Sequence, residues 1–438
     1  MAKPFHSVTL DESKCKGCIT CISRCPTGAI RVRNGKAKIL SELCIDCGQC
    51  IRLCPHRAKK AVFDPFEVTN NFKYKIALPA PSLYGQINNL NDIDYVLTAL
   101  KMMGFDDIFE VSKAAELISQ ATRKLMSENK LKKPIISSAC PAVVRLIRVR
   151  FPELCDNVLP LLSPMETAAR MAKDEAEKST GLDRSDIGVF FISPCPAKVT
   201  DTKNPIGFDK SEVDGVLAIS DIYPKLIGYM NKIDEPEQLA SSGIIGVSWA
   251  GSGGEASALL NEKYLAADGI DEVIKVLEEI EDDKLSDLDF IELNACNGGC
   301  VGGVLTVENP YVARTRLQRL RKYLPVSKNH LQTDDIHSLD WSDDLEPAQV
   351  MKLSDDLETA LQMMNEIDKI YNRLPMLDCG SCGAPSCRAL AEDIVLGYAN
   401  ENDCVFQLRE HIQSLARSIS NLEGFIPAPF RETKNQEK

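Results

Sequence analysis

Apolar runs alternate with helical patterns through the middle of the chain. Five of these runs have the short, β-rich character of strands: YKIALPAP (74–81), KKPIISSAC (132–140), DIGVFFISPC (186–195), IIGVSWAGSGG (244–254) and LDFIELNAC (288–296). Short apolar runs that alternate with helical segments are typical of α/β folds with parallel sheets. The pattern therefore predicts a parallel α/β domain from about residue 75 onward.

The C-terminal part has a helical pattern. Apolar residues recur at helical spacing from about Pro347 to Arg373, which predicts one long helix. Its apolar positions are Val350, Leu353, Leu357, Leu361, Met364, Ile367 and Ile370. Residues 405–438 are expected to add a further helix and a polar tail, a candidate for a partner contact.

The composition is that of a globular, acidic protein. Of the 438 residues, 44% are hydrophobic and 26% are charged, enough to bury cores in two or three domains. The formal net charge of −12 disfavours nucleic acid or an anionic membrane as a partner, since both attract basic surfaces. No apolar run reaches the roughly 18–20 residues that span a bilayer, and residues 1–14 lack a signal-peptide core. We expect a soluble, cytoplasmic protein.

Seventeen cysteines change this picture, because many of them are only two or three residues apart. Such close spacing does not suit regular disulfide geometry. In a reducing compartment, clustered cysteines indicate metal binding.

Two cysteine runs near the N-terminus repeat the pattern C-x2-C-x2-C-x3-C-P. They read CKGCITCISRCP (15–26) and CIDCGQCIRLCP (44–55), and they begin 29 residues apart. This is the bacterial ferredoxin pattern, in which three cysteines bind one [4Fe-4S] cluster and the fourth binds the other. We assign Cys15, Cys18, Cys21 and Cys54 to one cluster, and Cys44, Cys47, Cys50 and Cys25 to the second. Residues 1–60 resemble a two-cluster ferredoxin, and a zinc knuckle is the disfavoured alternative.

Three of the apolar runs end at cysteines, namely Cys140, Cys195 and the pair Cys296 and Cys300. Ligands of open α/β sheets bind beyond the carboxyl ends of the strands, so these four thiols are expected to converge. Four thiolates suit either a zinc ion or a further cubane. The glycines around Cys300 remove side chains and leave room for a bulky group, which favours the second alternative. They are Gly298, Gly299, Gly302 and Gly303.

The segments SSACPAVVRLI, ISPCPAKVTD and ELNACNGGCVGG are similar to the three active-site motifs of [FeFe]-hydrogenases, and residues 67–330 resemble the catalytic domain of that family. The resemblance implies a [4Fe-4S] cubane on Cys140, Cys195, Cys296 and Cys300. Cys300 would bridge this cubane to a diiron unit that carries CO, cyanide and an azadithiolate, together forming the H-cluster. It further implies that Lys198 donates to a cyanide ligand and that Pro194 and the four glycines contact the cofactor.

The chain departs from the family pattern at several positions. Fast [FeFe]-hydrogenases have a proton-relay cysteine where this chain has Ala139, which carries no transferable proton. Further out, Ala121 and Thr122 stand where relay glutamates are expected, and Leu159 stands in place of a serine. Ser193 and Asn294 replace methionines near the cofactor, so a shifted redox potential and slow turnover are expected.

These departures resemble the sensory branch of [FeFe]-hydrogenases. The implied function is slow, reversible H2 oxidation and proton reduction that reports H2 or redox state. The implied partners are H2, protons, a redox partner such as ferredoxin, and a separate signalling kinase or phosphatase. The alternative is a non-catalytic electron-transfer or scaffold protein without the diiron unit, as in eukaryotic hydrogenase-like proteins of iron–sulfur assembly.

A last cysteine set, with C-x2-C-x4-C-x16-C spacing, comprises Cys379, Cys382, Cys387 and Cys404. It resembles a small iron–sulfur domain found in sensory hydrogenase relatives and predicts one more [4Fe-4S] cluster, with zinc as the alternative. Cys155 is then the one cysteine without a cluster, and we expect it to be buried and idle. His56 is expected at the surface.

The expected organisation has three parts. Residues 1–66 form an α+β two-cluster ferredoxin-like domain. Residues 67–345 form an α/β H-cluster domain of two lobes with parallel sheets. Residues 346–438 form a small, mainly helical [4Fe-4S] domain with a C-terminal tail.

Overall fold

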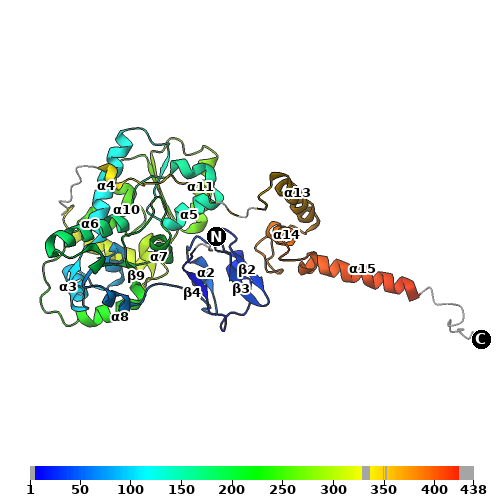
Figure 1. Ribbon diagram of the computed structural model, residues 1–438, viewed down its shortest axis with the longest axis horizontal. Helices are drawn as coiled ribbons and strands as arrows, with labels where there is room; N and C mark the ends of the chain where they lie inside the picture. The colour runs from blue at the N-terminus through cyan, green and yellow to red at the C-terminus, as the bar shows by residue number, and fades with distance from the viewer. Residues whose placement is uncertain (1–4, 328–335, 349, 351–352, 424–438) are drawn as a thin grey trace, which may run out of the picture. The chain divides into compact units, whose positions relative to one another are not determined.

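The computed structural model describes residues 5–327, 336–348, 350 and 353–423 (Figure 1). The chain divides into two compact units. Unit 1 contains residues 1–15 and 39–350, and unit 2 contains residues 16–38 and 351–438. The predicted boundaries after residues 66 and 345 stay predictions. No helix among the described residues has the length and apolar character needed to cross a bilayer.

Unit 1 contains two parallel sheets. The first has the order β6-β5-β8-β9, with β6 (Asp107–Ile108), β5 (Tyr74–Pro79), β8 (Ile187–Ser193) and β9 (Gly215–Ala218). The second has the order β10-β11-β7, with β10 (Tyr264–Asp268), β11 (Phe290–Asn294) and β7 (Ile135–Ile136). Every residue of β8 is buried, as expected for a strand covered on both faces. The predicted parallel α/β architecture is confirmed.

Helices follow most of these strands. They are α3 (Asp94–Met102), α4 (Val111–Ser127), α5 (Pro141–Arg150), α6 (Pro164–Thr180), α7 (Pro196–Lys203), α8 (Ile219–Met230), α9 (Ile244–Ser248), α10 (Gly254–Ala258), α11 (Ile270–Glu281) and α12 (Pro310–Leu320). The first sheet packs Phe190 and Leu217 against the apolar faces of α3 and α8. The second packs Ile291 and Leu293 against α5 and α11.

The Cys-Pro pairs of the sequence have a structural reason. Cys140 is the residue before α5, and Pro141 is the first residue of that helix. Cys195 and Pro196 stand in the same relation to α7. Proline is favoured at the first helical position because its fixed φ suits the helix and its missing N–H would have no helical partner there. The thiols therefore lie at turns that join buried strands to helices.

The prediction of a strand at residues 244–254 was wrong. Residues Ile244–Ser248 form α9, and α10 begins at Gly254. Helix α9 packs directly on α4, where a Cβ added to Gly246 would lie 2.0 Å from the carbonyl oxygen of Ser112. The apolar run is thus explained by close helix packing. The short β6 and β10 strands were not predicted.

The remaining part of unit 1 is a small N-terminal segment. It contains the antiparallel pair of β1 (Val8–Leu10) and β4 (Lys59–Ala61) and the helix α2 (Gln49–Leu53). Asp46 holds this segment together, since its carboxylate accepts hydrogen bonds from the backbone N–H of Ser7 at 2.9 Å and the hydroxyl of Thr200 at 2.7 Å.

Unit 2 combines residues far apart in the sequence. It contains α1 (Thr20–Ser23), the hairpin of β2 (Ile30–Arg33) and β3 (Lys36–Ile39, whose last residue is assigned to unit 1), α13 (Leu357–Arg373), α14 (Cys387–Val395) and α15 (Val405–Glu423). The predicted helix begins at Leu357 instead of Pro347, because Asp356 caps it by accepting a hydrogen bond from the N–H of Thr359. The described residues between 347 and 356 are not helical.

One buried carboxylate joins the two parts of unit 2. Asp393 of α14 accepts a hydrogen bond from Arg31 at 2.8 Å and one from Arg33 at 2.5 Å, both on β2. Next to it, the N–H of Val32 donates to the carbonyl of Gly383 at 2.7 Å. The cysteine-rich C-terminal segment is therefore attached directly to the hairpin that follows the first ferredoxin motif.

Asp393→Ala should separate these two parts of unit 2. The substitution leaves the buried Arg31 guanidinium without its partner, and removal of one member of a buried ion pair costs roughly 3–5 kcal/mol. Hydrogen exchange should show faster exchange of the Val32 amide. Arg388→Ala, which removes an exposed ion pair with Asp368, should change little. Unchanged Val32 protection in the Asp393 variant would contradict this account.

Candidate active site

Four predicted cluster cysteines surround one site in unit 1. Cys140 and Cys195 precede α5 and α7, Cys296 follows β11, and Cys300 begins a 3-10 turn, Cys300–Gly302. Cys195 interacts electrostatically with each of the other three thiols, so the four lie close together as predicted. Desolvation raises the pKa of Cys195 and Cys296, and raises that of Cys300 to about 12.

The spacing of these thiols favours a cluster over a single zinc ion. A tetrahedral Zn²⁺ with Zn–S bonds of about 2.3 Å would hold its sulfur atoms roughly 3.8 Å apart. Among the described residues, only His6, Cys44 and Asp46 form a group of three or more ligand atoms within 4.8 Å of one another. The four thiols are more widely spread, and this fits a cubane, in which each thiolate binds a different iron.

Lys198 places a positive charge beside these thiols. Its ammonium donates to the carbonyl oxygen of Ala139 at 3.3 Å, and only 8% of the residue is exposed. Desolvation lowers the pKa of the ammonium, but the neighbouring Cys300 and Cys195 outweigh it, so the pKa is raised. Lys198 thus stays charged and can neutralise part of an anionic group bound next to Cys300.

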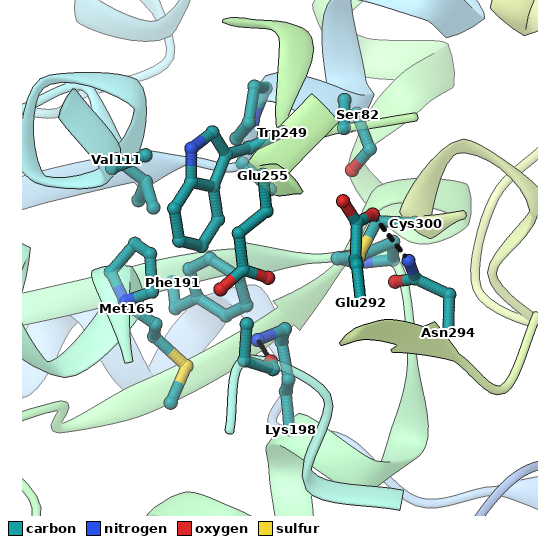
Figure 2. A pocket seen from close by; sticks show the side chains of 17 residues that line it. Ser82, Val111, Met165, Phe191, Lys198, Trp249, Glu255, Glu292, Asn294 and Cys300 are labelled. Carbon is teal, nitrogen blue, oxygen red and sulfur yellow. Dashed lines mark hydrogen bonds between the residues drawn. The ribbon is translucent and has the colours of Figure 1, made fainter. Parts of the chain in front are cut away.

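A cavity with about 580 Å³ of empty volume, part of it open to solvent, lies beside Cys300 and Lys198. Apolar side chains form much of its wall, including Val111, Met165, Phe191 and Trp249 (Figure 2). Ligand sites commonly combine such a wall with a few converging polar groups. The cavity therefore has the lining of a ligand site beside Cys300.

Two buried glutamates in the cavity wall were not predicted. Figure 2 shows the side chains of Glu255 and Glu292 beside Lys198, Asn294 and Cys300. Desolvation, together with the nearby charge of Glu292, raises the pKa of Glu255 to about 8. Desolvation also raises the pKa of Glu292. The raised pKa favours the protonated form of the Glu255 carboxyl inside the cavity.

These two carboxyl groups have different hydrogen-bond partners. Glu292 accepts from the N–H groups of Gly253 at 2.9 Å and Ala256 at 2.8 Å, as well as from Asn294. Glu255 accepts from the hydroxyl of Ser137 at 2.6 Å. Hydrogen-bond donors stabilise the ionised form of a carboxyl group, and Glu292 has more of them than Glu255. If the pair holds one proton, that proton is therefore more stable on Glu255.

Ser82 is a further unpredicted residue of the cavity wall. Its side chain is completely buried, and its hydroxyl has no hydrogen-bond partner. A buried hydroxyl without a partner is costly unless a bound group satisfies it. This orphaned group fits a cavity that is built around a polar cofactor.

The residues at which the chain departs from the family pattern lie in different places. Ala139 and Asn294 line the cavity, as does Pro194, which was expected to contact the cofactor, whereas Ser193 is not among the lining residues. The Ser193 hydroxyl instead donates to the carbonyl of Cys195 at 3.0 Å. The alanine at position 139 thus faces the cavity in the place where the family carries a thiol.

The positions expected for an outer proton relay hold no acidic group. Ala121 and Leu159 belong to an apolar core cluster, and the hydroxyl of Thr122 donates within its own helix to Ile118.

The glycines near Cys300 have a packing reason of their own. A Cβ on Gly302 would lie 2.1 Å from the carbonyl oxygen of Asn297, and one on Gly303 would lie 2.1 Å from that of Pro194. Gly299, with a φ of +86°, would bring a Cβ to 2.5 Å from the N of Ser252, and Gly298 has a φ of +79°. Close approach of protein backbones therefore requires glycine here, and contact with a cofactor stays a prediction.

The second ferredoxin motif lies against the loop that carries Cys300. Arg52 of α2 donates to the carbonyl oxygen of Gly302 and hydrogen-bonds to Cys296. A Cβ on Gly48 would overlap the side chain of Val304. The motif that contains Cys44, Cys47, Cys50 and Cys54 is thus in direct contact with the four-cysteine site.

The last four predicted cluster ligands come together in unit 2. Cys379, Cys382, Cys387 and Cys404 line one pocket with about 290 Å³ of empty volume. The first ferredoxin motif, which carries Cys18, Cys21 and Cys25, lies nearby, since Arg33 donates to the carbonyl of Cys382 at 3.1 Å. Ile19 packs beside Gly380.

Two residues without a predicted metal role lie where they were expected. Cys155 is buried, and His56 is exposed.

Infrared titration should detect a carboxyl group that loses its proton at a pH of about 8. Because the pKa of Glu255 is raised from its ordinary 4.5, the folded protein keeps a proton between about pH 4.5 and 8 that the unfolded chain has lost. The absorption of the protonated carboxyl should disappear as the pH rises through about 8. Glu255→Gln should abolish this signal, and Glu262→Gln, at an exposed position, should preserve it. A signal that persists in Glu255→Gln would assign the proton elsewhere.

Three family models match segments of this chain. Residues 73–264 and 256–304 match the family model "Iron only hydrogenase large subunit, C-terminal domain". Residues 7–55 match a 4Fe-4S dicluster domain, and residues 374–406 match an Fe-S cluster domain.

Curated relatives include a NADP-reducing hydrogenase subunit, HndD, of Solidesulfovibrio fructosivorans, 24% identical over 68% of this chain and 64% of its own. Another is iron hydrogenase 1 of Clostridium pasteurianum, 25% identical with the same coverage. This chain therefore spans less than two thirds of their length. A solved [FeFe]-hydrogenase from Chlamydomonas reinhardtii aligns with a TM-score of 0.44 at 14% identity, over 61% of this chain and 87% of its own. Since the hydrogenase model matches more than half of the 438 residues, the chain belongs to the iron-only hydrogenase large-subunit family.

Proposed function

We propose that this protein is an [FeFe]-hydrogenase of low turnover that interconverts H2 with two protons and two electrons and serves to sense H2 or redox state. The observation that carries this proposal is the cavity in which Cys300, Lys198 and the protonated Glu255 meet. It combines a place to attach a metal group, a charge to neutralise it and an internal proton donor.

In this proposal Cys140, Cys195, Cys296 and Cys300 hold a cubane, and Cys300 also holds the diiron unit. When bound, the diiron unit supplies the site at which H2 is formed or split. The ammonium of Lys198 would donate a hydrogen bond to a cyanide ligand of that unit and would balance part of its negative charge. Phe191 and Trp249 add apolar surface to the cavity wall, and a poorly polar wall strengthens the electrostatic effect of Lys198.

Protons would move through Glu255, since Ala139 cannot carry one. Glu255 is protonated near neutral pH and its carboxyl lines the cavity, so it can both donate and accept a proton there. Glu292 keeps the pKa of its neighbour raised. The proposed route replaces the thiol relay of the family with a carboxyl relay through Glu255, which Ser137 links to the backbone N–H of Ala139.

Electrons would pass between cysteine sites that the fold brings together. The second ferredoxin motif contacts the Cys300 loop through Arg52, and the C-terminal cysteine set contacts the first motif through Arg33. We propose four [4Fe-4S] clusters in all, including the cubane. A ferredoxin-type protein would exchange electrons with them, and a signalling kinase or phosphatase would read the output.

Slow turnover is part of the proposal because several groups are less suited to rapid catalysis. Ala139 removes a proton carrier, and Asn294 replaces a soft thioether with an amide that bonds to Glu292 at 2.8 Å. Such a site suits a sensor, in which occupancy by H2 matters more than flux. Ser193 and Asn294 would shift the cofactor potential through their hydrogen bonds.

Glu255→Gln should lower H2 evolution by roughly 10²–10⁴-fold in the reconstituted protein, the usual contribution of a general acid or base. The amide is nearly isosteric but cannot donate an acidic proton. Iron content should stay unchanged. Glu116→Gln, at another buried glutamate outside the cavity, provides the matched control and should keep wild-type activity. Wild-type rates in Glu255→Gln would reject the carboxyl relay.

Ala139→Cys should raise turnover by about tenfold, a modest part of what a proton relay can contribute. The new thiol would stand in the cavity wall at the position where the family carries its relay. Ala142→Cys adds the same group in α5, outside the cavity, and should leave the rate unchanged. No gain in Ala139→Cys, with the cofactor bound, would place the rate limit at another step.

The non-catalytic alternative makes a different prediction for the metal content. An electron-transfer or scaffold protein would hold about sixteen iron atoms in four cubanes, whereas the proposed enzyme would hold two more.

A further inference from the structure

Helix α15 carries an uncovered apolar stripe. Figure 1 shows it extending away from α13 and α14 as one long helix. Five apolar side chains form this stripe and are 41–61% exposed in the described part of the chain, while Phe406, 39% exposed, lies beside it; the five are Val405, Leu408, Ile412, Leu415 and Ile419. The first turn is anchored, because the side chain of Gln407 donates to the carbonyl of Arg373 at 2.5 Å.

The stripe has the spacing of a coiled coil. Successive apolar positions are three, four, three and four residues apart, which is the a and d pattern of a heptad repeat. The a positions hold β-branched residues, Val405, Ile412 and Ile419, and the d positions hold Leu408 and Leu415. Branched residues at a with leucine at d favour parallel, two-stranded coiled coils. A helix that packs on an irregular apolar surface does not require β-branched residues and leucines to alternate in this way.

The charges beside the stripe permit pairing with an identical helix. The e positions hold Arg409 and Ala416, and the g positions hold His411 and Ser418. In a parallel pair, each g residue meets the e residue of the following heptad, so His411 meets the partner copy's alanine and no like charges oppose each other.

A membrane surface fits this helix less well. Residues 405–420 contain two arginines, one glutamate and no lysine. Interfacial helices are instead rich in basic residues on their polar face.

We propose that α15 pairs with α15 of a second copy of this chain in a parallel, in-register coiled coil. The 19 residues of the helix span about 29 Å and make fewer than three heptads, so the dimer should dissociate on dilution. The coil begins at the residue after Cys404, which would place the two C-terminal cysteine sites at the same end of the pair.

Sedimentation of the full chain over a range of concentrations tests this proposal. The wild type should approach twice 48.3 kDa as its concentration rises. Leu415→Lys should weaken the dimer at least tenfold, because it places two ammonium groups opposite each other in the apolar seam. Ser414→Lys adds the same charge outside the seam and should dimerise like the wild type.

A sharper test exchanges isoleucine and leucine between the a and d positions of the apolar stripe. Leu408→Ile, Ile412→Leu, Leu415→Ile and Ile419→Leu together leave the composition unchanged but put leucine at two of the three a positions and isoleucine at both d positions. That arrangement favours tetramers, so the particle mass should rise above that of the dimer. A wild type that stays monomeric, or a dimer that Leu415→Lys leaves intact, would overturn the proposal. An assembly unchanged by the branching exchange would equally exclude a coiled coil. None of these readouts depends on the diiron unit or on hydrogenase activity.

Discussion

Strand ends fix the position of the four thiols that are proposed to bind metal in this fold. β7, β8 and β11 are buried strands of parallel sheets, and a cysteine follows shortly after the end of each one. The prolines after Cys140 and Cys195 are the first residues of the next helices. The two cysteines are therefore held in short turns between a strand and a helix. The cavity, the lysine beside it and the contact with the second ferredoxin motif all depend on this arrangement.

Charge balance in a poorly solvated site is the second constraint. Four thiolates and a metal group would be costly to bury without compensation. Lys198 supplies one positive charge from the side of α7, and Arg52 supplies another against Cys296. The same poor solvation keeps a proton on Glu255. Poor solvation of the site thus strengthens the attraction of Lys198 for an anionic cofactor and also favours the protonated form of Glu255.

The sequence predicted the features that depend on covalent spacing. Cysteine intervals specify clusters, and β8 was recognisable because a strand buried on both faces must be apolar throughout. The helix at residues 244–248 was missed because it depends on the close packing of Gly246 against α4. Such a tertiary contact cannot be read from the local sequence. The start of α13 was missed because the apolar period continues upstream of the Asp356 cap.

Glu255 and Glu292 show the main limit of sequence reasoning at this site. A glutamate in a glycine-rich segment reads as an exposed loop residue, and nothing local reveals that it faces another buried carboxyl. The clue for Glu292 was its place within the apolar run FIELN, where a charged side chain must find a buried partner. The glycines around Cys300 were noticed, but their role in backbone packing required the folded chain.

The central claim is that Cys300 and Lys198 hold a diiron unit in the cavity. An infrared spectrum of the anaerobically purified protein, recorded after the diiron cofactor is supplied, tests this most directly. Iron-bound CO and cyanide absorb in a window where polypeptide does not. The account predicts bands in that window for the wild type and their loss in Cys300→Ser. Their absence from a wild type with all its cubanes present would contradict it.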